Sequence, residues 1–197
     1  KTKRFRFGSF NHSRKLSQKT IALFCEVMAA VPSAELVLKS VSFVEQAEQE
    51  RVKALFIREG LDPKRLILLP WIEGRFNHMA SYKEMDVALD PIPYGGATSS
   101  CEALIMGVPV ITLAGKGMVS RLSASILESA KHSEWIAIEP KEYTQIAIKL
   151  AHSGPRSSEL RRKLRVQMQK SDLMNGKRMA KQIEQHFHTL VRERSAA

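Results

Sequence analysis

A strand, a turn and the start of a helix follow one another in the stretch Asp86-Val87-Ala88-Leu89-Asp90-Pro91-Ile92-Pro93-Tyr94-Gly95-Gly96-Ala97-Thr98-Ser99-Ser100-Cys101-Glu102. The apolar run at its start predicts a buried strand, which Pro91 and Pro93 end because proline has no backbone N–H to donate. The two glycines permit a tight turn and a close approach of the backbone. The hydroxyl side chains after them are typical of a helix N-terminus. The stretch therefore indicates one strand–turn–helix unit of an α/β domain.

The same alternation continues on both sides of this unit. Short, almost entirely apolar runs predict buried strands, and amphipathic segments between them predict helices. Such strands favour a mostly parallel sheet that helices cover on both faces, as in a doubly wound, Rossmann-like α/β domain. We expect strands at 4–10, 36–38, 66–69, 86–90, 108–113 and 135–138, with helices at 18–31, 43–59, 76–83, 98–106 and 119–129.

Beyond Pro140 the apolar pattern is helical only. Two stripes at helical spacing follow the break at Ser153-Gly154-Pro155, one with Leu164 at its centre and one with Ile183. We expect these C-terminal helices, within 155–194, to pack on the sheet. Residues 1–197 would then form one Rossmann-like domain.

Composition limits the class of protein. The chain has 197 residues and a net charge of +11, which suits an anionic partner. No apolar run reaches the roughly 18 residues of a membrane span, so we expect no membrane partner. Much of the excess charge lies after Arg156, where a solvated helix face is the simpler interpretation. Nucleic acid is an unlikely partner, because the segment 156–181 has no aromatic residues between its basic ones.

With two distant cysteines and no secretory signal, the chain is expected in the cytoplasm. Its basic start leads directly into a strand, so we interpret the chain as a fragment of a longer protein.

The turn at Gly95-Gly96 is a candidate anion site. Unpaired N–H groups and the helix dipole favour negative charge at a helix N-terminus, and the hydroxyls of Thr98 and Ser99 add donors. Glu102, one helical turn further on, could accept a hydrogen bond from a ribose hydroxyl. An ordinary glycine turn with a Ser/Thr cap has the same pattern, so this alternative stays open. The stretch matches neither a Walker loop nor Gly-x-Gly-x-x-Gly.

Two other loops follow strands and should reach the same edge of the sheet. The first holds His12 and Lys15, and Lys15 supplies a cation for a departing diphosphate. The second, Trp71-Ile72-Glu73-Gly74-Arg75-Phe76-Asn77-His78, could form a wall beside the base and sugar. Metal binding is not expected: Asp86 and Asp90 form no tight carboxylate cage, and no Cys/His cluster has zinc spacing.

Three segments together resemble glycosyltransferase family 41, the protein O-GlcNAc transferase and SPINDLY group. They are Phe7-Gly8-Ser9-Phe10-Asn11, the run from Asp86 to Ser99, and the run from Cys101 to Thr112, and Gly115 with Ser120–Ser125 continues the match. The resemblance covers nearly the whole chain, in order. It implies the C-terminal, donor-binding domain of a GT-B enzyme that is metal-independent and inverting. It also implies an acceptor-side catalytic domain and tetratricopeptide repeats before this chain.

The resemblance assigns roles to residues by position. Lys15 would hold the diphosphate as the catalytic cation, and His12 would contact the donor and help to stabilise the leaving group. The donor-binding positions would be Glu73, Arg75, His78, Gly96, Ala97, Thr98, Ser99 and Glu102. The general base would lie in the absent domain, so this fragment is expected to bind nucleotide but to turn over nothing.

The implied reaction transfers a sugar from a nucleotide diphosphate to Ser/Thr hydroxyls of a protein, without a cofactor. UDP-GlcNAc is the leading donor. Ala97 stands where the O-GlcNAc enzymes have His, Ser81 where they have Arg, and Gly95 where they have Asn. These departures leave the sugar open, since SPINDLY-like members of the family use GDP-fucose and others use UDP-glucose. A non-catalytic nucleotide- or partner-binding module is the alternative.

Overall fold

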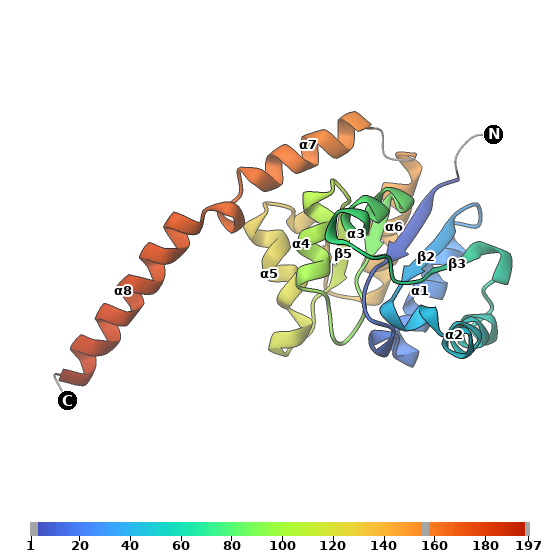
Figure 1. Cartoon of the computed structure of the whole chain (residues 1–197), viewed down its shortest axis with the longest axis horizontal. Helices are drawn as coiled ribbons and strands as arrows, with labels where there is room; N and C mark the ends of the chain where they lie inside the picture. Colours follow the sequence, from blue (N-terminus) through green and yellow to red (C-terminus); the bar gives the residue numbers. More distant parts are fainter. Residues whose placement is uncertain (1–3, 155–157, 196–197) are drawn as a thin grey trace.

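Six parallel strands form the sheet in the order β3-β2-β1-β4-β5-β6. The structure, a computed structural model, describes residues 4–154 and 158–195. Figure 1 shows the sheet between layers of helices. This confirms the predicted doubly wound, parallel α/β fold. The strands are β1 (Arg6–Ser9), β2 (Glu35–Lys39), β3 (Leu66–Leu69), β4 (Val87–Leu89), β5 (Val110–Leu113) and β6 (Ile136–Ala137).

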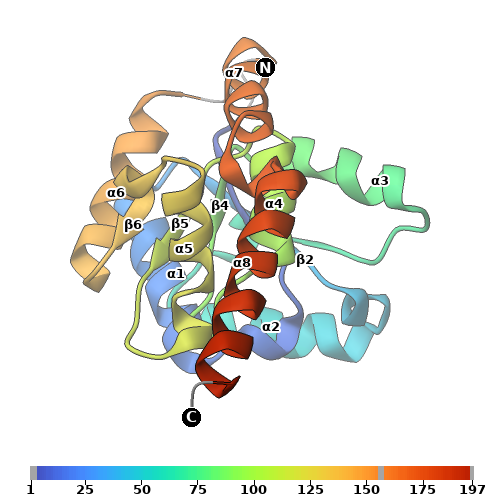
Figure 2. The same ribbon diagram turned by 90° about the vertical axis from the view of Figure 1, so that its left-hand side faces the viewer.

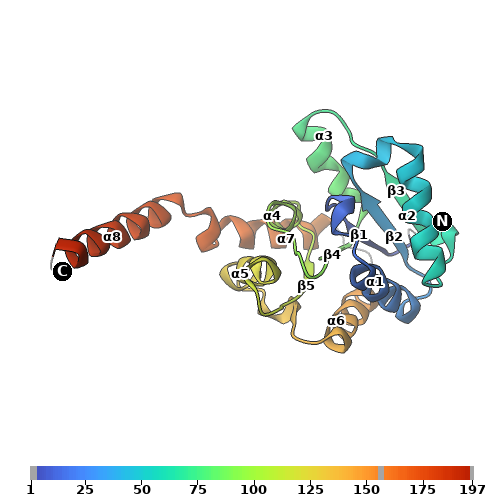
Figure 3. The same cartoon turned by 90° about the horizontal axis from the view of Figure 1, so that it is seen from below.

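The helices cover both faces of the sheet, as right-handed crossovers require. Helix α1 packs against α6 on one face, whereas α4 contacts α5 and α7 on the other (Figure 3). The helices are α1 (Gln18–Ala30), α2 (Gln46–Arg58), α3 (Arg75–Ala80), α4 (Thr98–Ile105), α5 (Leu122–Ser129), α6 (Pro140–His152), α7 (Ser158–Gln169) and α8 (Gly176–Ser195). Short 3-10 turns join several of them.

The core is apolar at the positions that the sequence pattern predicts. Phe7, Leu36 and Val87 are fully buried in the central strands. Ser17 caps α1 by accepting a hydrogen bond from the Thr20 N–H at 3.1 Å. The sixth strand is shorter than expected, because Ile138 is 77% exposed and its N–H is bound by Glu142 Oε2 at 2.8 Å.

Helices α7 and α8 differ from one another. Leu164 and Met168 bury the apolar side of α7 against the domain, and Arg161 donates to the carbonyls of Tyr82 and Met85. Helix α8 instead extends away from the sheet (Figures 1 and 3) and points toward the viewer in Figure 2, and its described side chains are all exposed. The expectation that the C-terminal helices pack on the sheet therefore does not hold for α8. Helical periodicity shows that one face is apolar but not what covers it.

The strand order reverses between β1 and β4, which lie side by side with Phe7 paired to Val87. The connections from β1 and β4 leave in opposite directions across the sheet. Ligands of doubly wound sheets bind in the crevice that this divergence leaves at the carboxyl ends of the strands. The loops after Ser9 and Leu89 therefore frame the candidate site.

Candidate functional site

The loops after β1 and β4 meet through Lys15. Its ammonium group donates to the Gly95 carbonyl at 2.8 Å and to Asn11 Oδ1 at 3.3 Å, and it lies 4.2 Å from the centre of the Tyr94 ring. Partial burial lowers the pKa of Lys15, and the Asp90 carboxylate opposes that shift. The structure thus fixes a cation beside the glycine turn, where the sequence predicted one.

Asp90 lies buried beneath the turn at Gly95-Gly96 and stabilises the conformation of that turn. The Gly96 N–H donates to Oδ1 at 2.6 Å, and the Thr112 hydroxyl donates to Oδ2 at 2.8 Å. Burial raises the pKa of Asp90, although these hydrogen bonds act in the opposite direction. From the sequence, Asp90 was considered only as a metal ligand, together with Asp86, and metal binding was not expected. The position of Asp90 at the end of a strand, six residues before a glycine, was the signal for this structural role.

Gly96 has a different role from the one predicted. Its N–H is bound to Asp90 and its carbonyl accepts from Ser123 Oγ at 2.9 Å, so its backbone holds the turn together. A Cβ on this residue would lie 2.5 Å from Ser100 Oγ and 2.6 Å from Ser99 Oγ. The turn therefore needs glycine for close packing, and the backbone N–H of Gly96 is already used within the protein.

Helix α4 starts without a side-chain cap. Ala97 occupies the N-cap position and makes no side-chain hydrogen bond there, so the N–H groups of the first turn have no capping oxygen. The Ser99 hydroxyl donates to Asn11 Oδ1 at 3.0 Å and ties the two loops together. Thr98 is exposed. Of the two predicted hydroxyls, Thr98 is thus the one placed to meet a ligand.

His78 and Glu102 come together as a pair from α3 and α4. His78 Nε2 lies 3.0 Å from Glu102 Oε2, which also accepts from the Tyr82 hydroxyl at 3.0 Å. His78 Nδ1 lies 2.8 Å from the amine of Lys39 at the end of β2. The sequence predicted His78 and Glu102 as donor-binding residues but missed Lys39 and Tyr82.

His12 lies near this pair. Its Nδ1 accepts from the Arg14 N–H at 3.2 Å, so the neutral ring carries its proton on Nε2 and can donate to a ligand oxygen. It also lines a hollow of about 260 Å³ beside the pair. The other lining residues are Phe10, Asn11, Lys39, Ser40, Val41, Trp71 and His78.

Glu73 and Arg75 lie on the exposed loop before and at the start of α3. The Glu73 carbonyl accepts from Asn77 Nδ2 at 2.9 Å. Within the described part of the chain, neither side chain has a hydrogen-bond or ionic partner. The structure thus brings Lys15, Ser99, His78 and Glu102 into one connected site and leaves Glu73 and Arg75 at its rim.

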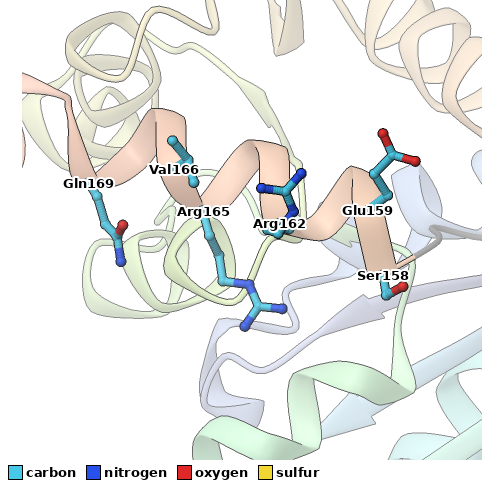
Figure 4. Close-up of a pocket in the computed structure, with 6 residues that line it drawn as sticks. All are labelled: Ser158, Glu159, Arg162, Arg165, Val166 and Gln169. Carbon is cyan, nitrogen blue, oxygen red and sulfur yellow. The ribbon is translucent and has the colours of Figure 1, made fainter.

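Other features lie apart from this edge of the sheet. A surface hollow of about 610 Å³ runs along α7 (Figure 4), on the helix that Arg161 ties to residues preceding β4. Among the described residues no group of three His, Cys, Asp or Glu side chains could hold a metal ion. Over the same residues, no helix is long and apolar enough to cross a membrane. Asp86 and Asp90 occupy opposite ends of β4, so they form no shared site.

Comparison with known proteins gives consistent matches. The glycosyl transferase family 41 profile matches residues 3–183. The chain is 34% identical over 186 residues to the probable UDP-N-acetylglucosamine–peptide N-acetylglucosaminyltransferase SPINDLY of Solanum lycopersicum, covering 94% of this chain and 20% of the relative. It is 26% identical over 178 residues to the UDP-N-acetylglucosamine–peptide N-acetylglucosaminyltransferase of Caenorhabditis elegans, covering 90% and 15%. The chain thus spans about a fifth of the length of these curated relatives.

Solved structures agree with this match. A mutant of Thermobaculum terrenum O-GlcNAc transferase superposes with a TM-score of 0.75 at 32% identity, covering 85% of this chain and 31% of the other. Sucrose-phosphate synthase from Thermosynechococcus elongatus superposes with a TM-score of 0.62 at 20% identity, covering 95% and 46%. The second likeness concerns the fold alone.

Proposed function

Because the chain belongs to glycosyl transferase family 41, we propose that it is the domain that binds the nucleotide-diphosphate sugar for transfer to a protein. One observation carries the proposal. The Lys15 ammonium group is bound to the Gly95 carbonyl at 2.8 Å, directly before the uncapped N-terminus of α4. A fixed cation and a helix N-terminus side by side suit a diphosphate.

The proposed reaction is an inverting displacement. A protein Ser or Thr oxygen attacks the anomeric carbon, the bond from that carbon to the diphosphate oxygen breaks, and the nucleoside diphosphate leaves. Lys15, the α4 N–H groups and the Thr98 hydroxyl stabilise the charge on the departing oxygen, and the Nε2–H of His12 adds a donor. These groups supply the positive field that a metal-independent transfer needs. The proton of the acceptor hydroxyl passes to a base that we place in a preceding catalytic domain.

We keep UDP-GlcNAc as the leading donor. The names of the SPINDLY and Caenorhabditis relatives support it. Ala97 and Ser81 stand at positions where the O-GlcNAc enzymes have larger side chains, so the sugar must be determined by experiment. The partners in this proposal are the nucleotide sugar, a protein acceptor, and the catalytic domain and tetratricopeptide repeats before this chain. Its place would be the cytoplasm, which the free thiols of Cys25 and Cys101 support.

Calorimetry with UDP, GDP and ADP tests the site. We expect one nucleotide to bind, and Lys15→Met to weaken that binding at least tenfold, because an ammonium–phosphate hydrogen bond is charge-assisted. Lys53→Met, on the exposed side of α2, is the control and should bind as the parent does. If none of the three binds, or if Lys15→Met binds normally, the site assignment fails.

A non-catalytic binding module is the second candidate. Both carboxylates of the site, Asp90 and Glu102, already accept hydrogen bonds from protein groups. Neither is therefore placed as a general base, which favours a binding role for this chain. Turnover by this chain joined to its preceding domain would decide for the enzyme. Nucleotide binding without turnover in that longer protein would decide for the module.

A further inference from the structure

Lys39 ends β2 inside the domain rather than in solvent. The residue is 4% exposed, and lysine is rarely buried to that extent unless it is paired. Its amine is bound to His78 Nδ1 at 2.8 Å and to Ser81 Oγ at 2.9 Å, and it lies 5.4 Å from the centre of the Phe10 ring. No acidic side chain is within hydrogen-bonding reach of it among the described residues. A buried cation held by an imidazole is therefore part of the site's construction.

The partners of His78 determine its tautomer. An ammonium group only donates hydrogen bonds, so Nδ1, which faces Lys39, must be the unprotonated nitrogen. A carboxylate only accepts, so Nε2, 3.0 Å from Glu102 Oε2, must carry the proton. Lys39 thus donates to His78, and His78 donates to Glu102, so the series of hydrogen bonds ends on the carboxylate.

This series of hydrogen bonds leaves one carboxylate oxygen of Glu102 available. Both the His78 N–H and the Tyr82 O–H donate to Oε2. Oε1 receives no hydrogen bond from the described residues, and the Glu102 side chain is 23% exposed. Its orientation is therefore fixed from one side while the other oxygen remains open to a ligand hydroxyl.

We propose that Lys39 is a positioning residue for the nucleoside part of the donor. Its ammonium donor at Nδ1 and the Glu102 carboxylate at Nε2 together select the Nε2–H tautomer of His78, and His78 then holds Glu102 so that Oε1 faces the ribose hydroxyls. The proposal rests on the donor-binding function above, and it adds a residue outside the predicted donor-binding set. A Lys39 that served folding alone would not alter the hydrogen bond at His78 Nδ1 or distinguish between ligands.

Nitrogen NMR of the imidazoles tests the first step without any ligand. In the parent, the two His78 ring nitrogens should give separate signals, one protonated and one not, and His78→Phe assigns them. Lys39→Met should move the Nδ1 signal, because Nδ1 loses its donor, and should leave Nε2 protonated, because Nε2 still donates to Glu102. Ser81→Ala removes the other partner of the amine and the hydrogen bond from Ser81 Oγ to the His78 carbonyl. It touches neither ring nitrogen, so it should leave the signals in place. Averaged signals in the parent, or equal shifts in Ser81→Ala, would overturn the proposal.

Binding of two probes tests the second step. Lys39→Met should weaken binding of the preferred nucleoside diphosphate about tenfold and change binding of inorganic pyrophosphate less than twofold, since pyrophosphate has no ribose. Lys53→Met should change neither. Equal losses for both probes would show a general defect and overturn the proposal.

A double-mutant cycle separates positioning from packing. If Lys39 acts through His78, adding Lys39→Met to His78→Phe should weaken nucleotide binding no further. Losses that multiply instead would contradict the positioning role. If the parent binds neither probe, the donor-binding function fails and the ribose role fails with it, whereas the tautomer measurement still reports on the contact between Lys39 and His78.

Discussion

Gly96 shows how closely the turn is packed around its buried carboxylate. A Cβ there would lie 2.5 Å from Ser100 Oγ and 3.0 Å from Asp90 Oδ1, distances at which side chains or backbone must shift. We expect Gly96→Ala to lower the free energy of unfolding by about 1–3 kcal/mol, measured by urea denaturation. Gly176→Ala, where a Cβ meets open space, is the matched control and should stay within about 0.5 kcal/mol. Equal stability of the two variants would contradict this packing.

Asp90 should make stability depend on pH. Burial raises its folded pKa above the unfolded value of about 3.9. The folded state therefore binds more protons in that window, and stability decreases as pH rises through it. Asp90→Asn removes this contribution. The stability of the variant relative to the parent should thus improve as pH rises above about 4, by at most about 1.4 kcal/mol per pH unit.

Urea denaturation of both proteins at several pH values between 4 and 7 measures this difference. The other titrating groups cancel when the variant is subtracted from the parent. A difference that is constant with pH would show that Asp90 carries the same charge in the folded and unfolded states.

At the scale of elements, α7 and α8 present the same apolar periodicity in different surroundings. Leu164 of α7 is 6% exposed, whereas Leu190 of α8 is 60% exposed. We expect Leu164→Ala to cost about 2–5 kcal/mol of unfolding free energy, because it leaves a cavity. Leu190→Ala should change it by less than about 0.5 kcal/mol. Urea denaturation of the pair compares the same substitution on both helices, and similar costs would show that α8 also packs.

The strands and the site turn were predictable because their signals are local. Prolines end β4, two glycines follow, and the apolar runs indicate where the strands lie. Lys39 was not predictable, because a single lysine after an apolar strand resembles any solvated strand end. Its partners His78 and Ser81 lie 39 and 42 residues away, and only the parallel pairing of β2 with its neighbours brings them together. The position of α8 also depends on contacts that periodicity does not specify.

At the scale of the whole molecule, the proposed nucleotide site and α8 lie in separate regions. The site occupies the carboxyl ends of β1 and β4, whereas α8 follows α7 and extends away from the sheet (Figure 1). A chain that ends at Met174 lacks α8 but keeps the buried residues of α7. We expect this shortened chain to fold and to bind the preferred nucleoside diphosphate within twofold of the parent.

Thermal denaturation and calorimetry of the shortened and parent chains measure this directly. Bound nucleotide raises the melting temperature of each by an amount that grows with the ratio of free nucleotide to Kd, so both chains should show the same rise at equal free nucleotide. Addition of Lys15→Met to the shortened chain should abolish that rise, which serves as the control for the site. A lower affinity of the shortened chain would mean that α8 contributes to the nucleotide site, and the separation of the two regions would then be wrong.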